Sequence, residues 1–433
     1  MKLFKSSILA VLIGSLVLIG CEDNDSTTDS NMMDVKTMVR VVHTSYDAPA
    51  VDVLINDQVA LSNLSYGMTS GYAEIDAGTS NIKVVPFGAT TPVVIEADLN
   101  LEEDMQYSVY AVNNLANISA VVSEDNREPV SSKAKVRFLH SSPDAPAVDI
   151  KLNSGSGPAV FSNASFGDIA DYIEVDQGTY NFVVTPSGST NEVVVFDPID
   201  VASGSVYTVI AHGTLDNTDE YDFATRVFID NDMGDMYADL VPAMSKVKVT
   251  HASPDAPGVD LLIDGIVINT SALTFPNNTG YLGVAAGTRN IKVNASGSTA
   301  TVIEADLTLG ANKSYSVFAT DVLANITPVV IEDDLTTPAL GKAHVRFLHL
   351  SPDAPAVNIT LTDGTVVFPN AAFQDYTSFT PLDAGSYELQ VRLAGTETVV
   401  LTLPTITVTD GMIYTVFAKG LVANLAAEII VNN

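Results

Sequence analysis

A short motif that combines histidine, serine and aspartate occurs four times in this chain of 433 residues. Its first copy contains His43, Ser45, Asp47 and Asp52. Histidine, serine and aspartate are the residue types of a nucleophilic triad. A histidine with two carboxylates has instead the donor types that bind a divalent cation. The motif therefore has two candidate chemistries, hydrolysis and metal binding.

The four copies of the motif are nearly identical. They read VVHTSYDAPAVD, FLHSSPDAPAVD, VTHASPDAPGVD and FLHLSPDAPAVN, and they begin at residues 41, 138, 249 and 347. Asn358 replaces the last aspartate in the fourth copy, which weakens a charge-dependent metal site there. The candidate metal ligands are therefore those of the first three copies: His43, Asp47, Asp52, His140, Asp144, Asp149, His251, Asp255 and Asp260.

A structural role for the motif is the stronger interpretation. The Ala48–Pro49 step favours an extended backbone, and Ser45 and Asp47 can hydrogen-bond to nearby main-chain groups. A catalytic site is needed once in a protein, whereas a network that shapes a loop is needed in every copy of a fold. We therefore expect no catalytic residue and no bound cofactor, with Ca²⁺ binding as the alternative and hydrolysis as a distant third.

The spacing of the motif sets the size of the domains. The four motif histidines stand at 43, 140, 251 and 349, so each copy heads a repeat of about 100 residues. A second level of similarity joins residues 94–99 to 302–307 and residues 115–118 to 323–326. Both segments are shifted by the same number of positions. The chain therefore reads as a two-domain unit that was duplicated.

Each repeat has the pattern of an all-β domain. In the first repeat we expect strands at 39–43 and 51–56 around the motif, and a hairpin of 81–86 and 93–97 that turns at Gly88. A second glycine in each copy should supply a positive φ: Gly78, Gly178, Gly287 and Gly385. A Tyr-Ser/Thr-Val segment near each repeat's end resembles the tyrosine corner of β-sandwiches, at Tyr107, Tyr207, Tyr315 and Tyr414.

These features predict four tandem immunoglobulin-like Greek-key β-sandwich domains. We place a signal peptide at 1–20, a lipidated cysteine with a flexible acidic tether at 21–38, and sandwich repeats at 39–132, 133–243, 244–341 and 342–433.

The N-terminus has the pattern of an exported lipoprotein. Lys2 and Lys5 precede an apolar run over residues 8–19, which is about 12 residues long where a membrane-spanning helix needs roughly 20. The run ends in Gly20–Cys21, which resembles a lipobox, and Cys21 is the only cysteine of the chain. We expect Cys21 to carry acyl chains such as palmitate. Each buried methylene would contribute roughly 0.8 kcal/mol to membrane anchoring.

The repeated motif and the later Tyr-Ser/Thr-Val segment together resemble a bacterial family catalogued as domain of unknown function 4397. The resemblance covers nearly all of residues 39–433. It implies extracytoplasmic repeats on surface proteins without an established activity, so it supports the fold and leaves the function open.

Charge and composition limit the partners. The net charge is −32, from 20 basic and 52 acidic residues, and such a surface repels nucleic acid. Two acidic stretches, 216–222 and 230–235, read as solvated linkers rather than calcium loops. The chain has no Trp, which lowers a glycan-binding interpretation. Tyr46 and Tyr66 are candidate exposed rings, with ordinary loop packing favoured for both.

We therefore expect a lipid-anchored scaffold or adhesion-type binding protein, without catalysis. Its partners would be the membrane, through the lipid, and polysaccharide or other envelope proteins. The expected location is the cell envelope, with the outer membrane or cell surface favoured over the periplasmic face of the inner membrane. A carbohydrate- or calcium-binding surface module is the alternative.

Overall fold

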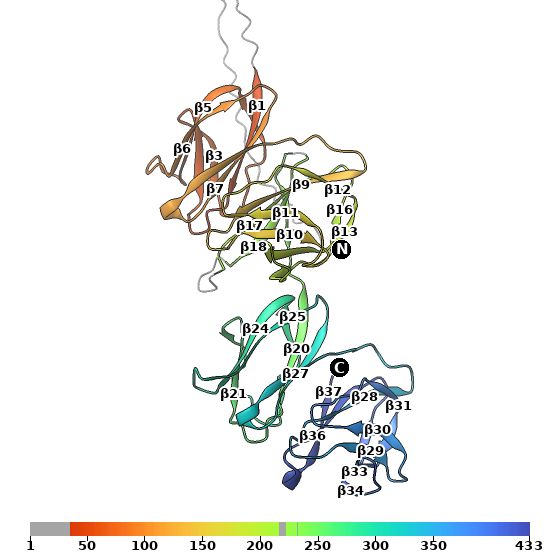
Figure 1. Cartoon of the computed structure of the whole chain (residues 1–433). Helices are drawn as coiled ribbons and strands as arrows, with labels where there is room; N and C mark the ends of the chain where they lie inside the picture. The colour runs from red at the N-terminus through yellow and green to blue at the C-terminus, as the bar shows by residue number, and fades with distance from the viewer. Residues whose placement is uncertain (1–34, 216–221, 232) are drawn as a thin grey trace, which may run out of the picture. The chain divides into compact units, whose positions relative to one another are not determined.

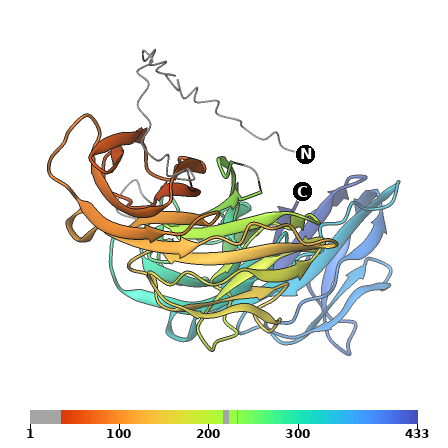
Figure 2. The same cartoon turned by 90° about the horizontal axis from the view of Figure 1, so that it is seen from above.

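The computed structural model describes residues 35–215, 222–231 and 233–433. Cys21, the leader and nearly all of the tether lie outside these residues. Figures 1 and 2 show the described chain from two sides as β-arrows joined by loops. Its helical segments are single 3₁₀ turns, η1 (Leu115–Asn117), η2 (Leu323–Asn325) and η3 (Val422–Asn424). Within the described ranges, no helix has the length and apolar character needed to cross a membrane.

Repeat 1 consists of two four-stranded sheets. Its strands are β1 (Lys36–His43), β2 (Val51–Ile55), β3 (Gln58–Leu64), β4 (Ala73–Asp76), β5 (Gly78–Pro86), β6 (Ile95–Leu101), β7 (Gln106–Val112) and β8 (Ser119–Glu124). One sheet has the order β4-β1-β7-β8 and the other β3-β2-β5-β6. The strands that we expected on either side of the motif and the hairpin that turns at Gly88 are confirmed.

The other repeats reuse this plan. Repeat 2 contains β9 (Lys133–Ser141), β10 (Val148–Leu152), β11 (Ala159–Ala164), β12 (Ile173–Asp176), β13 (Gly178–Tyr180), β14 (Phe182–Pro186), β15 (Val194–Val195), β16 (Ile199–Val201), β17 (Val206–His212), β18 (Ala224–Ile229) and β19 (Met236–Leu240). Repeat 3 contains β20 (Met244–His251), β21 (Val259–Ile263), β22 (Ile266–Val267), β23 (Leu282–Ala285), β24 (Gly287–Ala295), β25 (Thr301–Leu309), β26 (Ser314–Thr320) and β27 (Thr327–Glu332). Repeat 4 contains β28 (Lys342–His349), β29 (Val357–Leu361), β30 (Val366–Ala371), β31 (Thr380–Asp383), β32 (Gly385–Tyr387), β33 (Leu389–Leu393), β34 (Val399–Thr402), β35 (Ile406–Val408), β36 (Ile413–Lys419) and β37 (Ala426–Val431).

The strand order differs from the immunoglobulin order that the sequence led us to expect. In an immunoglobulin domain the first and second strands share a sheet. Here β1 and β2 lie in opposite sheets, and β1 pairs in parallel with β7 at the centre of its sheet. The reason is the motif loop, residues 44–50, which carries the chain across the core instead of folding back as a hairpin. The tandem sandwich is thus retained, but the immunoglobulin-like strand order is wrong.

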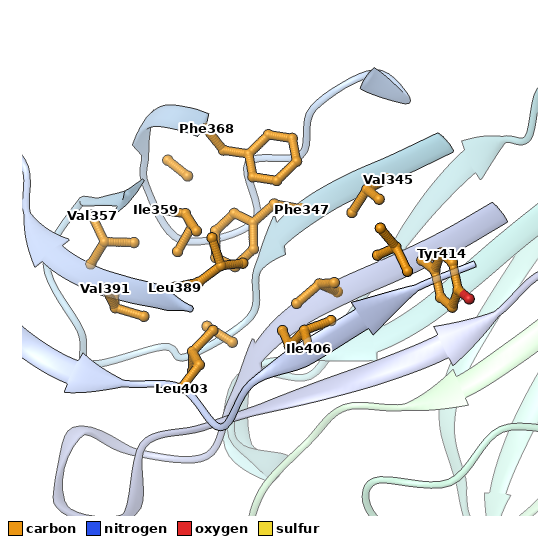
Figure 3. Close-up of a cluster of buried hydrophobic side chains, with 14 of the residues drawn as sticks. Val345, Phe347, Val357, Ile359, Phe368, Leu389, Val391, Leu403, Ile406 and Tyr414 are labelled. Carbon is orange, nitrogen blue, oxygen red and sulfur yellow. The ribbon is translucent and has the colours of Figure 1, made fainter. Parts of the chain in front are cut away.

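Each sandwich encloses its own apolar core. In repeat 4, shown in Figure 3, Val345 and Phe347 of β28 meet Ile359 of β29 and Val391 of β33. Alternate residues of β28 point inward, as the pleat of a strand requires. Most of the residues between them are buried as well, so β28 is buried along almost its whole length. A strand that is buried on both faces must have a second layer against its outer face.

The turn glycines behave in two ways. The hairpin glycine is left-handed in every repeat, with φ between +72° and +74° at Gly88, Gly188, Gly297 and Gly395. The second glycine has a positive φ at Gly78 and Gly287 only. The expectation of a positive φ at Gly178 and Gly385 is therefore wrong. In those two repeats the strand breaks instead into short pieces, β13 and β32, that pair with β16 and β35.

The chain divides into two compact units. The first comprises residues up to Asn191 with Phe196–Val241, and the second comprises Glu192–Val195 with Pro242–Asn433. Each unit thus holds two repeats. We call repeats 1 and 2 the first pair, and repeats 3 and 4 the second pair.

Candidate functional site: the motif loops and the paired faces

The motif histidine fastens its own loop. Nε2 of His43 lies 3.0 Å from the carbonyl oxygen of Pro49, and the same contact recurs in the other repeats at 2.9–3.2 Å. A carbonyl oxygen only accepts, so Nε2 must carry the hydrogen. Burial lowers the pKa of His43, His140 and His349, and the bond to the proline carbonyl only partly opposes this shift. These three histidines are thus neutral donors that close their loops.

The first aspartate of the motif ties the loop to a distant turn. Asp47 Oδ1 accepts a hydrogen bond of 2.6 Å from the main-chain N–H of Leu115, 68 residues further on. The corresponding distances are 2.9 Å for Asp144 and 2.7 Å for both Asp255 and Asp353. These bonds hold the turn after the seventh strand of the repeat plan against the motif loop.

The second aspartate fastens two further turns. Asp52 accepts from the N–H groups of Asn63 and Gly88, at 2.8 and 2.9 Å, and from the hydroxyl of Ser62 at 2.7 Å. Burial opposes its ionisation, but these three donors hold the pKa of Asp52 below its ordinary value. Asn358 of repeat 4 keeps one such bond, from the N–H of Asn370 at 2.7 Å. An uncharged amide can therefore replace the carboxylate in part.

The motif does not assemble a catalytic triad or a metal site in the described residues. A nucleophile and its base must be hydrogen-bonded to one another. Ser45 is buried and its Oγ has no hydrogen-bond partner in the described part of the chain, while His43 contacts Pro49. Among residues 35–215, 222–231 and 233–433, no three His, Cys, Asp or Glu side chains are grouped so that they could hold a metal ion. The candidate ligands each fasten a separate piece of backbone.

Replacing Asp149 with alanine is expected to lower the free energy of unfolding of the first pair by about 1–3 kcal/mol, because two main-chain N–H donors lose a buried carboxylate acceptor. These donors are Asn163 and Gly188, at 2.8 and 3.0 Å from the carboxylate. Asp149→Asn, which copies Asn358, should cost less. Urea unfolding measures both. Equal losses of stability in the two variants would contradict the partial replacement of the carboxylate by an amide.

The tyrosines of the later segment fasten the chain just upstream. The hydroxyl of Tyr107 accepts from the N–H of Glu102 at 3.1 Å, that of Tyr315 from Gly310 at 3.0 Å, and that of Tyr414 from Thr409 at 3.1 Å. This is the geometry of a tyrosine corner. Tyr207 instead lines an apolar cavity of about 90 Å³ in the core of repeat 2.

The outer face of the first strand carries a buried cation. In the first pair, Arg40 of β1 forms an ion pair of 2.5 Å with Asp230 of repeat 2, and both side chains are fully buried. The reciprocal pair joins Arg137 of β9 to Asp125 of repeat 1 at 2.6 Å. Each repeat thus gives one arginine to its neighbour and receives one aspartate. The two repeats are related by an approximate two-fold symmetry.

Neutral donors complete each ion pair. Asp125 accepts from the hydroxyl of Tyr72 at 2.6 Å, and also from Ser108. Burial opposes its ionisation, but Arg137 and Arg40 hold the pKa of Asp125 below its ordinary value. Around the other carboxylate, Asp230 accepts from Tyr172 at 2.7 Å and Thr208 at 2.5 Å. Such hydrogen bonds are what a buried ion pair needs to offset its desolvation.

The second pair keeps half of this arrangement. Arg346 of β28 forms an ion pair of 2.7 Å with Asp333 of repeat 3, to which Tyr281 also donates at 2.5 Å. At the reciprocal position Lys248 replaces the arginine and Asn432 replaces the aspartate. The lysine Nζ donates to Oδ1 of Asn432.

Apolar side chains surround the charges and come from both repeats. The first pair buries Val42 and Tyr110 of repeat 1 against Leu139, Ile210 and Phe228 of repeat 2. The second pair has an equivalent cluster of Ala252, Phe318, Ile331, Leu348, Leu350, Phe417 and Ile430. On the symmetry axis of the first pair, Thr44 and Ser141, equivalent residues that follow the motif histidines, share a hydrogen bond of 2.7 Å. Each pair therefore has a buried apolar interface between its repeats, in addition to the cores of the single sandwiches.

Two residues that we assigned to solvent or to loops, Asp230 and Tyr66, belong to this interface. Asp230 was expected in a solvated acidic linker, and it is fully buried. Tyr66 is half-buried, and its hydroxyl lies 2.6 Å from Nδ1 of His212 across the pair; Tyr46 is half-buried too. The signal that we missed is an arginine or lysine at the same position in the first strand of every repeat. These strands are otherwise largely apolar, and the chain has few basic residues.

His212 should make the first pair sensitive to acid. Burial, with Arg226 adding to it, lowers its pKa from 6.5 to about 4. Between pH 4 and pH 6.5 the unfolded chain binds more protons than the folded chain. The contribution of His212 to the free energy of unfolding is therefore fully present above about pH 6.5 and decreases as the pH drops towards 4, by about 3 kcal/mol at most. His212→Gln should flatten this part of the unfolding profile, whereas His344→Gln should not. If the free energy of unfolding of His212→Gln depended on pH as steeply as that of the wild type, His212 would not be the group responsible.

Fold and interface together define a class: a tandem β-sandwich protein whose repeats are held in pairs by buried charges. The family model described as domain of unknown function (DUF4397) matches residues 37–151, 134–235, 245–360 and 358–433, and the chain belongs to this family. No curated protein matches. A solved structure, the Bacillus anthracis TIE protein, is similar over 89% of this chain and 68% of its own, with 10% identity and a TM-score of 0.17.

Proposed function

We propose that this chain is a lipid-anchored extracytoplasmic scaffold or adhesion-type binding protein that presents its sandwich modules without catalysis. One observation carries the proposal: the motif's polar groups fasten loops in the same way in all four repeats. Groups that are committed to local structure four times over are not available for a reaction. Tandem modules on one anchor also favour avidity for a repeated ligand, such as a polysaccharide or a neighbouring envelope protein.

The anchor is part of the proposal. Export by the leader and acylation of Cys21 would place the repeats outside the cytoplasm, and the tether would separate them from the membrane. The high negative charge of the chain suits a soluble, projecting surface and disfavours nucleic acid as a partner.

Protease treatment of intact cells that express the full chain tests the location. Loss of the C-terminal repeat from a blot of intact cells is the expected result, with a periplasmic protein as the intact control. Survival until the outer barrier is broken would contradict a surface location.

Cys21→Ala should release the chain from the membrane fraction, and retention of this variant would contradict the lipid anchor. Turnover of ester, glycoside or peptide substrates by the purified chain would contradict the absence of catalysis.

A further inference from the structure

The second pair contains a lysine and an asparagine where the first pair has a buried arginine and aspartate. Lys248 lies in β20 of repeat 3, and Asn432 directly follows β37 of repeat 4. They are only 2% and 4% exposed, and Nζ donates to Oδ1 across the interface. An arginine and an aspartate can only form an ion pair. A lysine and an asparagine are also an amine and a primary amide.

The neighbours of Asn432 fix the orientation of its amide. An ammonium group only donates, so Oδ1 must face Lys248. Nδ2 points the other way and donates to Oγ1 of Thr415 at 2.8 Å. The amide carbon lies about 1.2 Å from its oxygen. An amine in contact with Oδ1 is therefore near the separation of roughly 3–3.5 Å at which attack on the carbon can begin.

The neighbours of Lys248 give its charge little support. The nearest buried acid, Asp333, is already paired with Arg346 at 2.7 Å and accepts from Tyr281 and Ser316. The ring of Tyr281 lies 4.2 Å from Nζ. Burial lowers the pKa of Lys248 to about 8, and the effect of Arg346 adds to this while that of Asp333 opposes it. The neutral amine is therefore more abundant near neutral pH than it is for an ordinary lysine.

We propose that Lys248 and Asn432 react to form an intramolecular amide bond that joins repeats 3 and 4 covalently. The contact is buried, and the orientation of the amide is fixed. Among the described residues, no other of the equivalent cross-repeat contacts joins a lysine to an asparagine. The first pair cannot form such a bond, because it has Arg40 and Asp230 at the same places.

The reaction balances without any further reagent. The ammonium of Lys248 first gives up one proton, and the neutral amine attacks Cγ of Asn432. The Nζ–Cγ bond forms, the Cγ–Nδ2 bond breaks, and the attacking nitrogen loses a proton to the departing group. The products are a secondary amide and ammonia, which takes up the proton released first. Holding the two groups in contact supplies an effective concentration on the order of 10⁵ M or more, which lets an intrinsically slow exchange proceed.

The bond would lock the second pair and so goes beyond the proposed scaffold function. It would connect the first strand of repeat 3 to the end of the last strand of repeat 4. A chain pulled at its ends would then transmit the load through the bond, and the second pair could not be separated by unfolding of its interface.

Tryptic digestion of the full purified chain, analysed by mass spectrometry, tests the bond. Without it, cleavage after Lys248 and Lys419 releases residues 249–289 and 420–433 as separate peptides. With the bond, trypsin cannot cleave after Lys248, and residues 247–289 and 420–433 appear as one branched species. Its mass is the sum of the two peptides less one ammonia. Near-complete conversion to this species is the expected result.

Lys248→Arg is the matched control, because it keeps the charge and copies Arg40 but cannot form the amide. It should yield residues 420–433 as a free peptide from an otherwise folded chain. Asn432→Ala serves as a second variant if Lys248→Arg does not fold. Quantitative recovery of free 249–289 and 420–433 from the folded wild-type chain, also after prolonged incubation at pH 9, would overturn the proposal.

Discussion

Replacing Asp230 with alanine is expected to lower the free energy of unfolding of the first pair by about 3–5 kcal/mol. The change leaves the fully buried Arg40 without its counter-charge, and it removes the acceptor of Tyr172 and Thr208. A lone buried charge costs far more than the ion pair contributes. Proteolysis across a urea series, read out on peptides from each pair, measures the loss and assigns it to one pair.

Two further variants isolate the cause. Asp76→Ala breaks the exposed pair with Lys36, at 2.5 Å and with an aspartate 79% exposed, and should cost no more than about 1 kcal/mol. Arg40→Met combined with Asp230→Leu should recover most of the stability, because neither charge is then stranded. If Asp230→Ala cost as little as Asp76→Ala, the buried ion pair would not hold the repeats together.

Phe417→Ala is expected to lower the free energy of unfolding of the second pair by about 3–5 kcal/mol. The ring is fully buried and contacts Phe318 of repeat 3 edge-on, with ring centroids 5.9 Å apart. Truncation would leave a cavity between the repeats rather than inside one of them. The same urea series measures the effect.

Phe87→Ala is the matched control for this variant. Its ring is 55% exposed in a hairpin of repeat 1, so the same truncation should change stability by no more than about 0.5 kcal/mol. A loss in Phe417→Ala that resembled that of Phe87→Ala would show that the interface cluster does not stabilise the pair.

The sequence allowed the repeat and its local structure to be predicted well. The motif gave the domain length, and the alternation around it gave β1, β2 and the β5–β6 hairpin. The predicted strand order was wrong. It depends on whether residues 44–50 turn back or cross the core, and both paths use the same turn residues. The parallel pairing of β1 with β7 is set by residues far apart in the chain.

The motif's role was predictable in kind but not in detail. Asp47 could be expected to bond to the backbone, yet its partner, Leu115, lies 68 residues away. The pairing of repeats was missed because a cation in an apolar strand has no visible partner in the sequence. Arg40 finds its counter-charge 190 residues away, in another repeat. Of the sequence signals that we interpreted, only the duplication as a two-domain unit pointed towards paired repeats.

Hydrogen exchange on the full chain carrying Asp230→Ala tests most directly whether the pair, rather than the single repeat, is the folding unit. If the pair is the unit, exchange becomes faster in β1 and β7 of repeat 1 as well as in β9 and β17 of repeat 2, and it stays unchanged in β20, β26, β28 and β36. Faster exchange confined to repeat 2, with repeat 1 as protected as in the wild type, would contradict the pair as the folding unit.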